Sequence, residues 1–257
     1  DHIIKKIKPN EIYHLAAQSH VGISFKSPFI TTQIDYIGVI NILDAVRFNS
    51  PRSKFYNAST SEIYGNINNN KILNEDSVKD PVSPYGISKL AAYHLTRIYR
   101  ESYNLFACNG ILFNHESPRR GLNFVTAKVI KGALEIKHKK KKFLELGNLD
   151  SMRDWGHAID YVYAMWLILQ QKKPQDFVVA TGISKSVRDL CKLVFFKLGL
   201  GDYKKFIKIN KRYLRPNELY HLRGNANKAK KILKWKATIS FEEMIDDMIE
   251  KLENRFF

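Results

Sequence analysis

The first half of the chain alternates short apolar runs with longer segments in which apolar residues recur every three or four positions. The short runs, which are typical of buried strands, are residues 11–17, 54–59 and 106–113. The longer segments, which have the helical period, are residues 28–49, 84–103 and 123–137. Strands and helices that alternate in this way form parallel β/α units joined by right-handed crossovers. The pattern therefore predicts an α/β fold with a Rossmann-like parallel sheet.

The alternation becomes less regular after about residue 121. Short runs at residues 143–146 and 176–181 have the composition of strands. Four further segments have the apolar spacing of helices: residues 161–171, 187–198, 226–233 and 241–252. We therefore expect two parts. Residues 1–121 hold most of the sheet, and residues 122–257 form a smaller, lid-like α/β part with some segments that return to the sheet.

The charge is the unusual feature of an otherwise ordinary globular composition. The 257 residues are 44% apolar and 26% charged, which excludes disordered and collagen-like classes. The 42 Lys and Arg against 25 Asp and Glu give a net charge of +17, which favours an anionic partner: nucleic acid, an anionic membrane or a phosphorylated small molecule. The basic run at residues 137–142 is more often a solvated helix end than an anion site.

Cysteine usage and hydropathy indicate the kind of compartment in which the protein functions. The two cysteines, Cys108 and Cys191, form no C-x-x-C motif, so we expect no zinc site and a reducing compartment such as the cytoplasm. No run of 18 apolar residues occurs, and residues 1–6 lack an apolar leader. We therefore expect neither a membrane span nor a signal peptide.

The segment Ser-Pro-Tyr-Gly-Ile-Ser-Lys at residues 83–89 carries candidate chemistry. Ser83 suits a helix N-cap and Pro84 suits the first helical position. Tyr85 and Lys89 then share one helix face, where an ammonium and the positive end of the helix dipole favour a phenolate. This arrangement suits a tyrosine that acts as a base on a hydroxyl. In isolation, however, such a pair is more often a surface tyrosine and a solvated lysine.

A second candidate segment, Ser-Thr-Ser-Glu-Ile-Tyr-Gly at residues 59–65, follows directly on a predicted strand. Ligands in open α/β sheets bind just beyond the carboxyl ends of the strands. Three hydroxyls and a carboxylate lie together there. The alternative interpretation is a helix cap, in which Glu62 completes a capping box with Ser59.

Taken together, these segments resemble the extended short-chain dehydrogenase/reductases and, among them, the GDP-mannose 4,6-dehydratases. The matching segments, in order along nearly the whole chain, are residues 14–21, 59–65, 83–89, 109–121, 146–157 and 215–218. The most specific is Asn-His-Glu-Ser-Pro-Arg-Arg-Gly at residues 114–121. Related enzymes that act on dTDP-glucose typically have Thr-Asp-Glu where this chain has Thr-Ser-Glu at residues 60–62.

The resemblance implies a lyase that uses NADP and converts GDP-mannose to GDP-4-keto-6-deoxy-mannose, a precursor of GDP-fucose. Tyr85 would take the proton of the 4-hydroxyl, with Thr60 bonded to the 4-oxygen. Glu62 would remove the C5 proton and help to expel water. Lys89 would hold the nicotinamide ribose and lower the pKa of Tyr85. The four catalytic candidates are therefore Thr60, Glu62, Tyr85 and Lys89, and no metal is expected.

The resemblance also assigns binding residues. Besides Tyr85 and Lys89, the cofactor-binding candidates are Leu15, Ala17, Gln18, Ser19, His115 and Arg120, with Arg120 near the adenosine 2′-phosphate. The candidates for the sugar nucleotide are Asn114, Asn123, Val125, Lys128, Arg153, Arg215 and Glu218. Residues 1–121 then form a partial NADP-binding domain and residues 122–257 mainly the GDP-sugar-binding part. Relatives form dimers or tetramers, so a homo-oligomer is expected, with neither nucleic acid nor membrane as a partner.

One family feature is absent from the sequence. The chain has no Gly-x-x-Gly-x-x-Gly loop, and its strand at residues 11–17 resembles the fourth strand of the family sheet. We therefore expect a fragment of a longer gene product that binds NADP poorly by itself. The alternatives are a truncated, inactive paralogue or structural subunit of the family and, less favoured, a basic nucleic-acid-binding module.

Overall fold

The structure, a computed structural model, describes residues 1–66 and 71–257. Its first part is built on a four-stranded, fully parallel sheet with the order β1-β2-β3-β7. These strands are β1 (Glu11–His14), β2 (Lys54–Thr60), β3 (Ala107–Leu112) and β7 (Phe177–Val179). Since β7 comes from the second half of the sequence, the two halves share one sheet.

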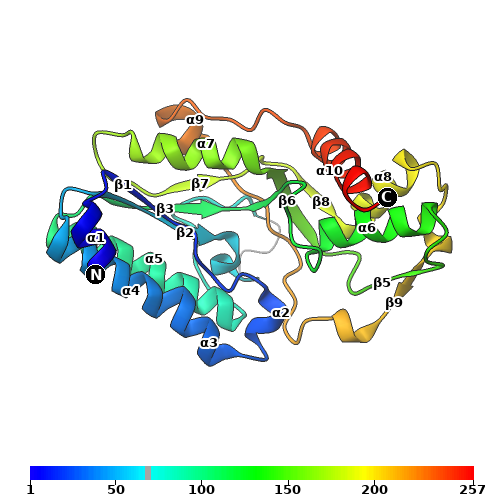
Figure 1. Cartoon of the computed structure of the whole chain (residues 1–257), viewed down its shortest axis with the longest axis horizontal. Helices are drawn as coiled ribbons and strands as arrows, with labels where there is room; N and C mark the ends of the chain where they lie inside the picture. The colour runs from blue at the N-terminus through cyan, green and yellow to red at the C-terminus, as the bar shows by residue number, and fades with distance from the viewer. Residues whose placement is uncertain (67–70) are drawn as a thin grey trace.

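Helices cover both faces of this sheet, as Figure 1 shows. One face carries α1 (His2–Ile7), α2 (Val21–Ser24), α3 (Pro28–Thr32), α4 (Gly38–Asn49) and α5 (Pro84–Tyr103). The opposite face carries α7 (Ala158–Leu169) and α9 (Asn227–Ile232). Both faces of β2 and β3 are therefore buried, which explains why these strands are continuous apolar runs.

The helix α5 has clear local signals at both ends. The Ser83 hydroxyl accepts a hydrogen bond from the Gly86 N–H at 3.0 Å, and Pro84 occupies the first turn. The helix ends where Asn104 adopts a left-handed conformation with φ of 54°. These signals place the expected Tyr85 and Lys89 in the first two turns, at the end of the helix that faces the carboxyl ends of the strands.

The predicted helix at residues 28–49 is interrupted. Between α3 and α4 the backbone makes a π-helical turn at Gln33–Ile37, which buries the Asp35 side chain. By length and composition this stretch is also the one candidate for a membrane span among the described residues. Here it packs on α5 and buries Val39, Leu43 and Val46, as a helix that covers a sheet does.

The second part combines short strands with three long helices. One small sheet has the order β4-β6-β8, with β4 (Asn114–Glu116), β6 (Met152–His157) and β8 (Ser184–Ser186), and a second pairs β5 (Leu144–Leu146) with β9 (Ile207–Ile209). The helices are α6 (Val125–Lys137), α8 (Val187–Lys197) and α10 (Phe241–Phe256). They enclose a core of their own, which includes Trp155, Phe195 and Met248.

The predicted α/β class and parallel sheet are confirmed by this arrangement. The predicted strand at residues 11–17 is shorter and ends at His14, because the chain leaves the sheet there toward α2. Sequence patterns also missed β4, β6, β8 and β9, several of which have only three residues. The polar segment Asn-Ile-Asn-Asn-Asn at residues 66–70 has a composition that predicts a loop tip, and it lies outside the described residues except for Asn66.

A buried polar network fixes β3 against α5. Arg100 donates two hydrogen bonds to Asp176, at 2.8 and 2.9 Å, and Asp176 also accepts from the Asn109 backbone N–H. We expect Asp176→Ala to reduce the free energy of unfolding by about 2 to 3 kcal/mol, because it leaves a largely buried guanidinium and the Asn109 N–H without their acceptor. Urea unfolding measures this, with Glu101→Ala in the exposed Arg97–Glu101 pair as a near-neutral control. Equal effects of the two substitutions would contradict the prediction.

Candidate active site

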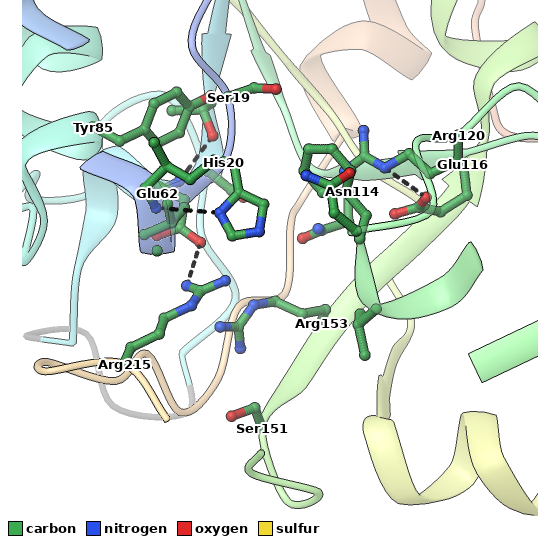
Figure 2. Close-up of a pocket in the computed structure, with 18 of the residues that line it drawn as sticks. Ser19, His20, Glu62, Tyr85, Asn114, Glu116, Arg120, Ser151, Arg153 and Arg215 are labelled. Carbon is green, nitrogen blue, oxygen red and sulfur yellow. Dashed lines mark hydrogen bonds and ion pairs between the residues drawn. The ribbon is translucent and has the colours of Figure 1, made fainter. Parts of the chain in front are cut away.

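A cleft of about 1290 Å³ lies between the carboxyl ends of the parallel strands and the second part of the chain. Figure 2 shows side chains from both parts converging on it. Of the residues predicted from sequence, these line the cleft: Leu15, Ala17, Ser19, Thr60, Glu62, Tyr85, Lys89, Asn114, His115, Arg120, Asn123, Val125, Lys128, Arg153, Arg215 and Glu218. Gln18 is the exception among the predicted set. Residues distributed over 200 positions of sequence therefore meet in one place.

Gln18 has a supporting position instead. Its side chain donates to the Thr31 hydroxyl and to the His20 carbonyl, and its backbone N–H donates to Asp35 at 2.6 Å. These bonds tie the loop after β1 to the helix that follows it. The prediction that Gln18 touches the cofactor is therefore not supported by its side-chain contacts, because those are taken up within the loop.

Burial dominates the electrostatics of the Tyr85–Lys89 pair. It raises the pKa of Tyr85, and the hydrogen bond from Thr60 and the charge of Arg120 act in the opposite direction. It also lowers the pKa of Lys89 to about 8, against the attraction of Asp35. Burial therefore outweighs the groups that lower the pKa of Tyr85 in this structure, and a lowering of that pKa by Lys89 stays a prediction. The charge that faces Lys89 is Asp35, and Thr60 is the main group that favours the phenolate.

Asp35 is a buried acid that acts on the charge of Lys89 and that the sequence analysis missed. It is 1% exposed, one of its oxygens (Oδ2) has no hydrogen-bond partner among the described residues, and burial raises its pKa to about 6. It lies in the π-helical turn, its Oδ1 accepts a hydrogen bond from the Gln18 backbone N–H, and its charge favours the ammonium form of Lys89. A carboxylate within an apolar helical segment was the signal available in the sequence.

Turnover should fall on the alkaline side of about pH 8, because Lys89 loses its positive charge as the pH rises through its lowered pKa. Asp35→Asn should move this alkaline limb to lower pH, since the amide removes the charge that favours the ammonium. An NMR titration of lysine-labelled protein checks both shifts without depending on activity. An unchanged Lys89 titration in Asp35→Asn would contradict the assignment, and Asp44→Asn on α4, where the carboxylate is bonded to the Tyr99 hydroxyl, is the control.

Thr60 and Glu62 are positioned by the end of β2. The Thr60 hydroxyl accepts the Glu62 N–H at 3.2 Å, so Thr60, and not Ser59, caps the short 3₁₀ turn at Ser61–Tyr64. The predicted capping box between Ser59 and Glu62 is therefore not formed. The Glu62 carboxylate is free of that structural task and is directed into the cleft (Figure 2).

A charge cluster in the cleft contains two arginines, Arg153 and Arg215, and two glutamates, Glu62 and Glu218. Arg215 Nη1 donates to Glu62 Oε1 at 3.2 Å, and Arg215 Nε lies 4.0 Å from Glu218 Oε1. Arg153 Nη2 lies 3.7 Å from the same Glu218 oxygen. Because Arg153 is buried and Arg215 is partly exposed, the cluster presents one fixed and one more accessible guanidinium to the cleft. Such a pair can hold a diphosphate.

The 114–121 motif forms the wall opposite Tyr85. His115 stacks on Tyr161, and burial lowers its pKa to about 4, so the imidazole is neutral. Arg120 lies over the Phe124 ring, and its Nε is 3.0 Å from Glu116 Oε2 without alignment for a hydrogen bond. Glu116 therefore balances the Arg120 charge in this structure, and contact of Arg120 with a 2′-phosphate stays a prediction.

The start of α6 faces the same cleft. No side chain among the described residues caps its N-terminus, and Val125 and Lys128 in its first turns line the cleft beside Asn123. Lys128 lies 3.3 Å from the centre of the Tyr213 ring. Free N–H groups and a lysine at a helix N-terminus suit an anionic ligand. Tyr213 was missed in the sequence, because it follows a lysine-rich segment with no periodic signal.

The residues present fit part of a dinucleotide. Lys89, which is 2% exposed, lines the cleft together with Ser59, whose buried hydroxyl has no hydrogen-bond partner among the described residues. These are donors suited to ribose hydroxyls and a carboxamide. The glycine-rich loop that cradles a pyrophosphate has no counterpart in the 257 residues. The fit therefore covers the nicotinamide half of the cofactor.

Comparisons with known proteins agree with this geometry. A family model described as GDP-mannose 4,6 dehydratase matches residues 1–248. The chain is 44% identical over 268 residues to the GDP-mannose 4,6 dehydratase of Drosophila melanogaster, covering 96% of this chain and 67% of that protein. It is 45% identical over 268 residues to that of Homo sapiens, covering 96% and 71%. The relatives are thus longer than this chain.

Solved structures show the same fold at low sequence identity. RMD from Pseudomonas aeruginosa, solved with NADPH, superposes with a TM-score of 0.87 at 24% identity, covering 96% of this chain and 82% of that one. The dTDP-glucose 4,6-dehydratase of Bacillus anthracis, solved with NAD, has a TM-score of 0.85 at 24% identity, covering 98% and 75%.

The parallel sheet, the helices on both of its faces and the match to these solved structures define a protein with a Rossmann-type α/β fold. Within this class, the chain belongs to the GDP-mannose 4,6-dehydratase family. The predicted resemblance is therefore confirmed at the level of the family.

Proposed function

We propose that the chain carries the catalytic and sugar-nucleotide sites of an NADP-dependent hydro-lyase that converts GDP-mannose to GDP-4-keto-6-deoxy-mannose. The observation that carries the proposal is the meeting of Tyr85, Thr60 and Glu62 in one cleft beside the Arg153–Arg215 pair. A second oxygen of Glu62, Oε2, is buried without a hydrogen-bond partner among the described residues. This reaction requires a base for the 4-hydroxyl, for which the Tyr85 phenol is the candidate. It also requires a second base for C5 and cationic side chains that hold the diphosphate.

The chain's own residues account for the proton transfers. Tyr85 takes the proton of the 4-hydroxyl while Thr60 orients the 4-oxygen. Once C4 is a ketone, the C5–H bond is acidic and Glu62 takes its proton. The C6–O bond then breaks, and the 6-hydroxyl leaves with the proton that came from the 4-hydroxyl, as water. Glu62 finally returns its proton to C5, so both bases end the cycle as they began.

When bound, NADP supplies the hydride chemistry, which is removal of hydride from C4 and its return to C6 within one cycle. Lys89 and Ser59 supply donors for the nicotinamide ribose end, and Leu15, Ala17 and Ser19 line the adjoining wall. Arg153, Arg215 and the start of α6 hold the diphosphate, with Asn114, Asn123, Val125 and Glu218 around the nucleotide. The NADP preference rests on the family resemblance and on Arg120.

The division of the chain into two parts, its oligomeric state and its compartment also follow from the proposed function. We propose an NADP-binding part at residues 1–121 and a GDP-sugar-binding part at residues 122–257, with β7 returning to the first sheet. We also propose a homo-oligomer, dimer or tetramer, in the cytoplasm. Both cysteines are buried and unpaired, which agrees with a reducing compartment.

The deciding experiment is to incubate the chain with GDP-mannose and NADP⁺ and follow the nucleotide by mass spectrometry. Loss of one water from GDP-mannose supports the proposed activity. If the substrate is unchanged, the same assay on a chain extended at its N-terminus with a glycine-rich βα unit distinguishes a fragment from an inactive paralogue. Failure of the extended chain as well would overturn the enzyme proposal in favour of a structural subunit.

A nucleic-acid module has little support in this arrangement. In the basic run at residues 137–142, Lys137 pairs with Glu253 and Lys141 pairs with Glu135. Ion pairs within the chain reduce the charge that this run offers to a phosphate backbone.

A further inference from the structure

The two oxygens of the Glu62 carboxylate have different environments. One oxygen, Oε1, accepts a hydrogen bond from Arg215 at 3.2 Å, and the other, Oε2, is buried without a partner among the described residues. Arg215 comes from a segment 153 positions further along the chain. Figure 2 shows its guanidinium directed up to Glu62 from the loop that lies below it in this view. The proposed base is thus held by a residue that the proposed function assigns to the substrate.

The charges around Glu62 allow the Glu62–Arg215 pair to separate when an anionic ligand binds. Arg215 and Arg153 are matched by Glu62 and Glu218, so the cluster is electrically balanced without a ligand. A diphosphate adds negative charge and competes with the carboxylates for the guanidinium groups, since planar N–H pairs suit phosphate oxygens. The side chain of Arg153 is 7% exposed, whereas that of Arg215 is 29% exposed. Arg215 is therefore the arginine with room to change partner.

We propose that Arg215 is a substrate-operated latch on Glu62: it pairs with the carboxylate in the empty cleft and transfers to the diphosphate of a bound nucleotide sugar, which frees Glu62 to take a proton. This inference rests on the proposed function. A carboxylate that loses a cationic partner and gains a nearby phosphate is a stronger base. The base is therefore active only when a substrate of the correct class fills the diphosphate subsite.

The test follows the Glu62 carboxyl carbon by NMR in glutamate-labelled chain, with the resonance assigned by its loss in Glu62→Gln. GDP is the probe, because it carries the diphosphate without the sugar, and guanosine is the control that lacks phosphate. We expect GDP, but not guanosine, to move the Glu62 resonance. In Arg215→Gln the resonance should already lie near its GDP-bound position, and GDP should move it much less. Equal movement in the two chains overturns the latch.

Kinetics of the active protein add a second readout. Arg215→Gln should raise the KM for GDP-mannose by about tenfold to a hundredfold, as expected for a lost charge-assisted contact. Its kcat should fall far less than that of Glu62→Gln, because Glu62 is already released. A large fall in kcat would show that Arg215 orients the base during the reaction and would overturn the latch. Arg215→Lys, which keeps the charge, guards against misfolding, and Arg52→Gln at an exposed position is the matched control.

The outcomes also separate this inference from the proposed function. If calorimetry shows no GDP binding and no glutamate resonance moves, both are overturned. If GDP-mannose loses water but the Glu62 resonance ignores GDP, only the latch is overturned.

Discussion

Replacing Tyr85 with phenylalanine should lower the turnover of GDP-mannose by about 100- to 10,000-fold, the usual contribution of a positioned proton-transfer group. The hydroxyl is the proposed acceptor of the 4-hydroxyl proton, and it lies at the start of α5, where Thr60 supports its ionised form. GDP affinity should stay unchanged, because the Tyr85 hydroxyl is not among the groups proposed to contact the diphosphate. Steady-state kinetics together with GDP calorimetry measure both quantities.

The control for this prediction comes from the same helix. Tyr103→Phe, at the exposed end of α5, removes a hydroxyl without touching the cleft and should keep normal turnover. Thr60→Val should lower turnover at neutral pH, since the Tyr85 phenolate loses the hydrogen bond that lowers the pKa of Tyr85. If Tyr85→Phe retains full activity, the base must be assigned elsewhere.

Glu62→Gln should stop the reaction at elimination, with a loss of product formation in the range of about 100- to 10,000-fold. The amide is of similar size and can stay near Arg215, but it cannot take the C5 proton. Oxidation at C4 does not need this carboxylate. Mass spectrometry should therefore detect a nucleotide lighter than GDP-mannose by two hydrogens, and little of the species lighter by one water.

This variant separates two roles that the structure leaves close together. If Glu62 served only to hold Arg215, the amide would affect substrate binding and leave elimination intact. Wild-type dehydration in Glu62→Gln would contradict its assignment as the second base. Glu101→Gln on the solvent side of α5 changes the same atoms at a position remote from the cleft and should behave as wild type.

Much of the fold and part of the site could be predicted from local sequence. The helix α5 forms over Pro84–Tyr103 as predicted, because its cap, its proline and its apolar spacing are all local signals. The same periodicity fixes Tyr85 and Lys89 on one helix face. The strands β2 and β3 are also recognisable, since strands buried on both faces are continuous apolar runs.

The short strands β4, β8 and β9 have three residues each, too few for a periodic pattern to appear. The π-helical turn at Gln33–Ile37 also leaves no mark in an apolar stretch that suits a regular helix equally well. Its consequence for Asp35 could therefore not be anticipated.

By itself, the sequence determined the α/β class, the family and the types of residue available for chemistry, because these depend on local patterns and motifs. Only the tertiary structure decided which charges meet. Lys89 faces Asp35, and Glu62 faces Arg215 over a separation of 153 positions. These charge pairs depend on how the two parts of the chain pack around the cleft. Burial in the cleft then disfavours the charged form of a group, which no local sequence pattern reveals.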